Sequence, residues 1–262
     1  MFGEAFMQRA LTAGSIIAAA CAYLGIFVIW RRIVFLSVAL SEVAALGVAI
    51  GFFFGQTSFL MAFLLTTVVT LIFWQLWHQQ RGFGEAAVGF IYALCAAASV
   101  LLVAKNPLAE ARGLDLVSGN ILYISTPELL VLSLVSLAVV GSQIVFRKEF
   151  VAVTFDRDFA LSLGLPAGFW DLIFYLSLGA LIGLAMRSCG LLFVFASLVI
   201  PPMAGLWATR RIHLSTLIAV LVAVFCVSAG LAVSWRFDLP AGPTIVALYS
   251  LAALLAVLAG RR

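Results

Sequence analysis

Long apolar runs, separated by short polar or charged links, dominate the chain from end to end. A helix needs about 20 apolar residues to cross a hydrocarbon core of roughly 30 Å. Nine runs approach this length, and each predicts a membrane-spanning helix. They cover approximately residues 11–30, 33–55, 58–77, 86–104, 128–146, 169–186, 190–209, 214–235 and 244–259.

The run 190–209 is the weakest of the nine. Pro201 and Pro202 lie inside it, and each proline removes a backbone hydrogen bond from a continuous helix. The preceding link, Arg187-Ser188-Cys189, is also short enough for a broken or re-entrant element. The pattern therefore predicts an all-α membrane bundle with eight to nine transmembrane helices, forming one domain over residues 1–262.

The composition agrees with a polytopic membrane protein. Hydrophobic residues make up 65% of the chain, charged residues only 10%, and the mean hydropathy is +1.21, far more apolar than a soluble core requires. The net charge of +4 does not indicate nucleic-acid binding, because the basic residues lie at the ends of apolar runs. The four cysteines stand singly inside apolar segments, without metal-ligand spacing, and are expected to be packing residues.

Lysine and arginine are distributed unequally between alternate loops. With the N-terminus outside, ten lie on the inner side and five on the outer side, which favours this orientation and a cytoplasmic C-terminus. The inner residues are Arg31, Arg32, Arg81, Arg147, Lys148, Arg157, Arg210, Arg211, Arg261 and Arg262. The outer ones are Arg9, Lys105, Arg112, Arg187 and Arg236.

Glu42 is the one carboxylate deep inside an apolar run. A charge near the centre of a membrane helix costs roughly 2.5 to 3.5 kcal/mol on insertion scales, so retention of one predicts a function. Glu42 would form a gate or an ion site, or share a proton with a second copy across a two-fold axis. The alternative is a neutral acid bonded to Ser37, Ser41 or a backbone carbonyl, serving packing alone.

A polar island at 147–171 falls on the predicted inner side. Asp156 is suited to cap a helix, Gly164 to end it, and Pro166 prevents its continuation, which predicts a helix of about two turns at about 155–165. Phe159 and Leu163, four residues apart, would share one face. Such a helix would rest on the membrane, pack within its own chain or insert into a groove on a partner.

Small residues and prolines predict close helix packing or hinges. Gly47, Gly51 and Gly55 recur every fourth residue, as in small-xxx-small contacts between membrane helices. Either a static contact or a sliding surface satisfies this pattern. Pro201 and Pro202 similarly mark either a hinge or a fixed kink.

Several ordered stretches resemble the permease subunit of bacterial ABC importers for zinc, manganese or ferrous iron. They are LGIFVIWRRIVFLSVALSEVAALGVAIG, EAAVGFIYAL, LDLVSGNIL, FDRDFALSLGLP and GLLFVFASLVIPPMAG. The resemblance implies a multi-pass protein of the bacterial cytoplasmic membrane that moves a divalent metal ion by alternating access. It also implies two permease copies or a related pair, cytoplasmic ATPase subunits, and a periplasmic or extracellular metal-binding protein.

In that family, the match to FDRDFALSLGLP is the helix that docks into the ATPase. The resemblance therefore assigns coupling to Phe155, Asp156, Phe159, Ala160, Leu163 and Gly164. The chain has no GxxxxGK[ST] phosphate loop, so ATP is expected on a separate subunit and no catalysis is expected here. The metal ion is substrate rather than a permanently bound cofactor.

The sequence departs from the family at the expected metal site. The family usually has Asp and, four residues later, His, where this chain has Val38 and Glu42. Val38, Ser41 and Glu42 are the positions expected along the path, with Glu42 the candidate metal ligand. Imidazole suits zinc, whereas carboxylate suits harder ions and ferrous iron, which leaves the cargo open.

Two alternatives to a metal-ion importer stay open at this point. In the first, the chain keeps the family fold but carries a different cargo or pairs with a related permease that supplies the ligands. In the second, it acts as an autonomous proton-coupled carrier using Glu42. His78 and His213 lie at inner ends of runs and are not assigned as ligands. Arg187 and Asp238, near the outer boundary, would contact a delivery protein or extend their charges to the interface.

Overall fold

The computed structural model describes residues 5–53, 58–79, 84–104, 121, 124–209 and 211–259, whose regular structure is helical throughout. The helices are α1 Ala5–Trp30, α2 Val34–Phe53, α3 Ser58–Gln79, α4 Gly84–Ala104, α7 Thr126–Val145, α8 Arg147–Phe155, α9 Arg157–Ser162, α10 Ala167–Cys189, α11 Leu191–Ala208, α12 Ile212–Phe237 and α13 Ala241–Ala259.

The structure confirms the predicted all-α bundle of eight to nine spans. Among the described residues, eight helices are long and apolar enough to cross a membrane, and a shorter apolar stretch, Leu60–Gln75, lies in α3. The uncertain run at 190–209 forms the continuous helix α11, with both prolines inside it. The predicted orientation of the termini stays a prediction.

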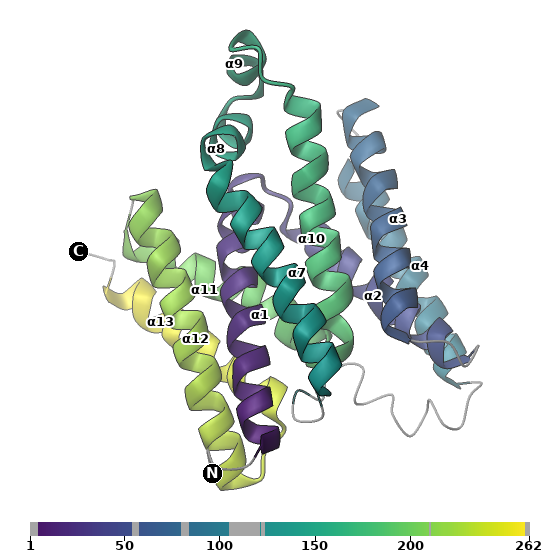
Figure 1. Cartoon of the computed structure of the whole chain (residues 1–262), viewed down its shortest axis with the longest axis vertical. Coiled ribbons are helices and arrows are strands. Elements are labelled where there is room, and N and C mark those ends of the chain that lie inside the picture. Colours follow the sequence, from purple (N-terminus) through teal and green to yellow (C-terminus); the bar gives the residue numbers. More distant parts are fainter. Residues whose placement is uncertain are drawn as a thin grey trace.

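Two groups of helices are joined through the middle of the molecule (Figure 1). On one side α2 packs against α3 and α4, and α10 packs against α3. On the other side α11, α12 and α13 pack together, with α1 against α11 and α12. Helices α1, α7 and α10 lie between these groups, and α8 and α9 project beyond the bundle at one end.

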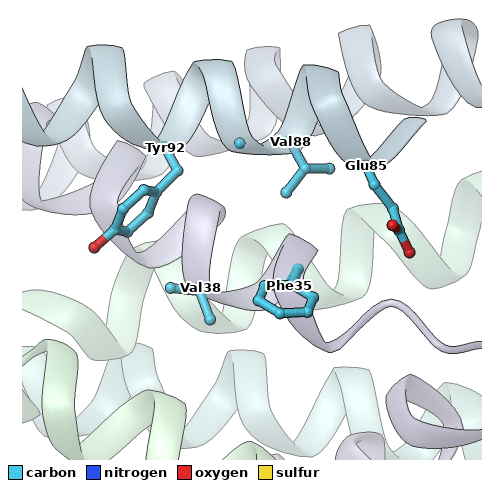
Figure 2. Close-up of a pocket in the computed structure, with 6 residues that line it drawn as sticks. Phe35, Val38, Glu85, Val88 and Tyr92 are labelled. Atoms are coloured by element: carbon cyan, nitrogen blue, oxygen red, sulfur yellow. The ribbon is translucent and has the colours of Figure 1, made fainter. Parts of the chain in front are cut away.

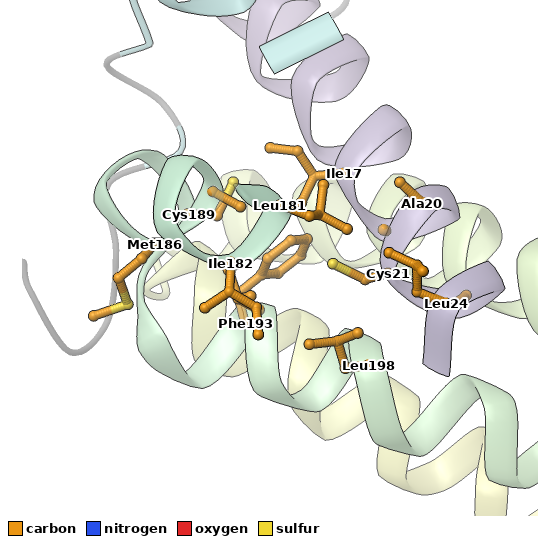
Figure 3. Packing of buried hydrophobic residues seen from close by; sticks show 14 of the residues in the cluster. Ile17, Ala20, Cys21, Leu24, Leu181, Ile182, Met186, Cys189, Phe193 and Leu198 are labelled. Carbon is orange, nitrogen blue, oxygen red and sulfur yellow. The ribbon is translucent and has the colours of Figure 1, made fainter. Parts of the chain in front are cut away.

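The central part of the core brings α1, α10 and α11 together (Figure 3). Cys21 and Leu24 of α1 lie close to Leu181 of α10 and to Phe193 and Leu198 of α11, and all are buried. All four cysteines are buried and unbridged, which agrees with the expected packing role.

Glycines set the closest approaches between helices. A Cβ added to Gly47 of α2 would lie 2.5 Å from Ala62 Cα of α3, so this predicted small-residue position is a tight helix contact. Gly51 is buried, and Gly55 lies outside the described residues. A Cβ on Gly25 of α1 would lie 2.0 Å from the Leu198 carbonyl oxygen and 2.5 Å from Pro202 Cγ.

This contact with Gly25 involves the turn that the two prolines alter in α11. Pro202 has no N–H to donate to the Leu198 carbonyl, four residues earlier. That oxygen instead faces the Gly25 backbone, where no side chain intervenes. The turn that holds both prolines therefore packs directly against Gly25 of α1, and α11 continues through it.

The predicted two-turn helix exists as α9, and its caps are those expected. Asp156 Oδ1 accepts a hydrogen bond from the Phe159 amide at 2.9 Å. Gly164 follows the helix with φ of +77°, a left-handed conformation that glycine adopts without strain. The preceding helix α8, Arg147–Phe155, was not predicted, because only the later part of this island carries clear cap residues.

Candidate functional site

After its first two residues, the described part of helix α2 is buried except along one narrow stripe. Between residues 36 and 51, every side chain is buried apart from Val38, Glu42, Leu46 and Ile50. A spacing of four residues keeps these positions on nearly one face, because a helix has 3.6 residues per turn. Glu42 therefore lies near the middle of α2, on the face that the described residues leave partly exposed.

The Glu42 carboxylate has no hydrogen bond or ion pair to any described residue. The hydroxyl of Ser37 donates to the Val34 carbonyl at 2.6 Å, and that of Ser41 donates to the Ser37 carbonyl at 2.9 Å. Neither serine therefore neutralises Glu42 by bonding to it. Ser41 is also fully buried, so the structure does not bring it onto the stripe with Val38 and Glu42.

A cavity of about 540 Å³ opens beside this stripe, between α2 and α4 (Figure 2). Phe35 and Val38 of α2 face Glu85, Val88 and Tyr92 of α4 across it. Glu42 lies one helical turn after the lining residue Val38, on the same stripe of α2. The cavity and Glu42 thus lie along the same junction between α2 and α4.

No cluster of three or more His, Cys, Asp or Glu side chains occurs in the described part of the chain. The described residues alone therefore do not supply a divalent ion at Glu42 with a set of side-chain ligands. The side chain of His78 lies outside those that the structure describes. His213 instead contacts Arg147 through its ring nitrogen at the junction of α7 and α8.

Apolar side chains are exposed on and beside α9, although Phe155, the last residue of α8, also packs against Trp30 of α1 with ring centres 5.0 Å apart. Phe155, Phe159 and Leu163 are each more than half exposed, at 58%, 56% and 60%. Ala160 is fully buried and packs with Val153 and Ala167, so it anchors α9 rather than facing outward. The predicted coupling residues therefore divide into outward-facing apolar groups and groups that shape or hold the helix.

An ion-pair cluster connects this projecting region to two membrane helices. Arg31, after the end of α1, donates to Asp171 of α10 at 2.6 Å and to Thr154 of α8 at 3.0 Å. Its guanidinium also lies 4.2 Å from the ring centre of Phe174. Arg157 of α9 approaches the other oxygen of Asp171 at 3.8 Å.

Sequence reasoning counted Arg31 only as a loop charge and did not single out Asp171 or Glu85. The sequence did give one indication that these three residues have a role, because each lies at the boundary of an apolar run. Arg31 and Asp171 are 140 residues apart in the sequence, so their pairing becomes visible only in the folded structure. At the opposite end of α10, Arg187 pairs with Glu128 of α7 at 3.2 Å, so its charge has a partner within the chain.

Comparison with known proteins gives one consistent result. Residues 4–260 match the model of the ABC 3 transport family. The manganese transport system membrane protein MntC of Halalkalibacterium halodurans is 26% identical over 95% of this chain and 86% of its own length. The chelated iron transport system membrane protein YfeC of Yersinia pestis is 27% identical over 95% and 85%.

The fold also matches a solved structure, PsaBC from Streptococcus pneumoniae in complex with Fab. The TM-score is 0.85 at 20% identity, covering 97% of this chain and 91% of that one. The family match covers nearly all of the chain, and this family comprises transport permease subunits whose ATPase is a separate polypeptide. The chain therefore belongs to the ABC 3 transport family and is a multi-pass membrane permease subunit of a metal-ion ABC importer.

Proposed function

We propose that two copies of the chain form a divalent-metal path, with Glu42 of each copy lining it. The carrying observation is that Glu42 lies in the middle of α2, on its one uncovered stripe, without a partner among the described residues. An unpaired carboxylate at membrane depth costs roughly 2.5 to 3.5 kcal/mol, which a bound proton, an ion or a second chain would offset, and the last two are what we propose. A two-fold axis along the stripe would bring the two carboxylates together.

The proposed cargo is manganese or ferrous iron in preference to zinc. Relatives named for manganese and for chelated iron support a metal cargo. Carboxylate oxygens suit the harder ions and ferrous iron, and the imidazole that suits zinc is absent at residue 42. A metal-binding protein outside the membrane would deliver the ion.

We further propose that α9 docks an ATPase subunit and transmits its movement. Exposed Phe159 and Leu163 offer an apolar surface outside the bundle, of the kind that a partner groove covers. Asp171 joins α9 to α10 and, through Arg31, to the end of α1. Helix α10 packs against α2 and α3, so movement of α9 has a direct route to the Glu42 helix.

Reconstituted vesicles test the proposal directly. The purified permease and its ATPase would be assayed for ATP-driven uptake of Mn²⁺, Fe²⁺ and Zn²⁺, with the wild type compared with Glu42→Gln. We expect Glu42→Gln to lose uptake while assembly with the ATPase persists. Glu149→Gln, which removes a carboxylate from α8, is the matched control and should transport normally.

Two outcomes would reject parts of the proposal. Unchanged metal uptake by assembled Glu42→Gln would remove Glu42 from the path. Uptake driven by a proton gradient without ATP would support an autonomous carrier instead. Activity of a purified single-chain permease with the ATPase would exclude a requirement for a different partner permease.

A further inference from the structure

We propose that the cavity between α2 and α4 is the inner exit of the metal path, with Glu85 as the cation's last protein contact. This inference rests on the proposed function, since it concerns an ion that has left Glu42. The occupant would be a divalent cation with part of its water shell.

The cavity has the size and position for this role. Its volume of about 540 Å³ greatly exceeds the roughly 30 Å³ that one water occupies in the liquid. Val38 lines it and precedes Glu42 by four residues, a rise of about 6 Å along α2. An ion moving from Glu42 toward the start of α2 would therefore enter the cavity.

Both helices that line the cavity start at the same end of it. Phe35, near the start of α2, and Glu85, near the start of α4, both contribute to its wall. The start of α2 follows Arg31, which bonds to α8 and α10, so this end of the cavity lies toward α8 and α9. In the predicted orientation, this is the cytoplasmic end.

The chemistry of the wall suits passage rather than tight binding. Glu85 is exposed and supplies the one ionisable carboxylate among the lining residues, while Phe35, Val38 and Val88 are apolar. A conducting path needs sites that attract an ion and yet release it. A single exposed carboxylate, following the more deeply placed Glu42, meets this requirement.

Substitution of glycine by leucine at two positions, one lining the cavity and one outside it, tests whether blocking the cavity slows transport. Gly89 lines the cavity, and a Cβ added there would meet no atom within 4 Å, so a larger side chain at this position has open space to enter. Gly141 of α7 is equally unobstructed but lies outside the cavity. Gly141→Leu therefore controls for the change from glycine to leucine within a membrane helix.

The test measures ATP-driven Mn²⁺ uptake in vesicles containing the permease and its ATPase, with assembly followed by co-purification. Glu85→Gln should lower uptake at saturating Mn²⁺ by about twofold to fivefold, the size expected from losing one exposed ionic contact. Glu85→Asp should restore most of the rate because it keeps the charge. Gly89→Leu should lower uptake at least as much, while Glu149→Gln and Gly141→Leu should match the wild type.

The outcomes separate this inference from the proposed function. If the wild type transports Mn²⁺ and both Glu85→Gln and Gly89→Leu assemble and transport at its rate, the exit role is rejected and the function stands. If only Gly89→Leu slows uptake, the cavity lies on the path but Glu85 has no role. If the assembled wild type moves none of Mn²⁺, Fe²⁺ or Zn²⁺ with ATP, the proposed function and the exit role both fail.

Discussion

Arg31 Nη1 lies 2.6 Å from Asp171 Oδ1, which ties the end of α1 to the start of α10. Both side chains are largely buried, with 9% and 14% of their surface exposed. Removing one partner of a buried pair leaves an uncompensated charge, whereas removing both does not. The pair is therefore expected to matter more for holding α1, α10 and α9 in register than for net stability.

A double-mutant cycle tests this pair. Asp171→Leu alone should destabilise the permease by roughly 3 kcal/mol, because it leaves the Arg31 guanidinium without its buried partner. The double variant Arg31→Met with Asp171→Leu should recover much of that loss. Thermal unfolding in detergent measures both, and simple additivity of the single effects would show that the two residues are not coupled.

Gly25 should tolerate no side chain. In Gly25→Ala the new Cβ would lie 2.0 Å from the Leu198 carbonyl oxygen, and neither backbone can yield easily. We expect a loss of about 1 to 3 kcal/mol or more, as for other overpacked contacts. The midpoint of thermal unfolding reports this change.

Gly141→Ala is the control for Gly25→Ala, since its Cβ would meet no atom within 4 Å. Alanine is the better helix former by about 1 kcal/mol, so this variant should be as stable as the wild type or more so. Equal unfolding midpoints for the two alanine variants would contradict the proposed close approach between α1 and α11.

A charge on the outer face of α9 should prevent ATPase binding without unfolding the permease. Phe159 is 56% exposed, so Phe159→Asp removes no core contact but places a carboxylate in the proposed apolar contact. Co-purification of the ATPase should fall by at least about tenfold, equivalent to about 1.4 kcal/mol. Leu239→Asp, at another exposed apolar position between α12 and α13, should leave co-purification intact.

Much of the fold could be predicted because membrane helices have a strong local signal. Each of the nine apolar runs corresponds to one helix of at least 18 residues in the described part of the chain, and Asp156 and Gly164 located α9 through its caps. The ends were less exact, since α10 begins at Ala167, two residues before the predicted run. The cap residues of a helix and the length of an apolar run involve residues that are close together in the sequence, so both can be predicted from the sequence alone.

The site was less accessible because its geometry depends on packing between distant segments. Glu42 and Val38 could be placed on one face from their spacing, but Ser41 is turned into the core and bonded within α2. Nothing local to Glu85 shows that it shares a cavity with Val38. The partner of Asp171 is also invisible in sequence, since any of several basic residues at run ends could have paired with it.

Residue 42 should control which metal is carried. Glu42→His combined with Val38→Asp places an imidazole and a carboxylate four residues apart on the uncovered stripe of α2. Because imidazole favours zinc and carboxylate alone favours harder ions, the ratio of Zn²⁺ to Mn²⁺ uptake should rise by about tenfold, or about 1.4 kcal/mol. Competition between the two ions in ATP-driven vesicle uptake measures this ratio. Leu46→His, one turn further along the stripe, controls for adding an imidazole elsewhere on the same face, and an equal shift in both variants would mean that residue 42 has no special place in selection.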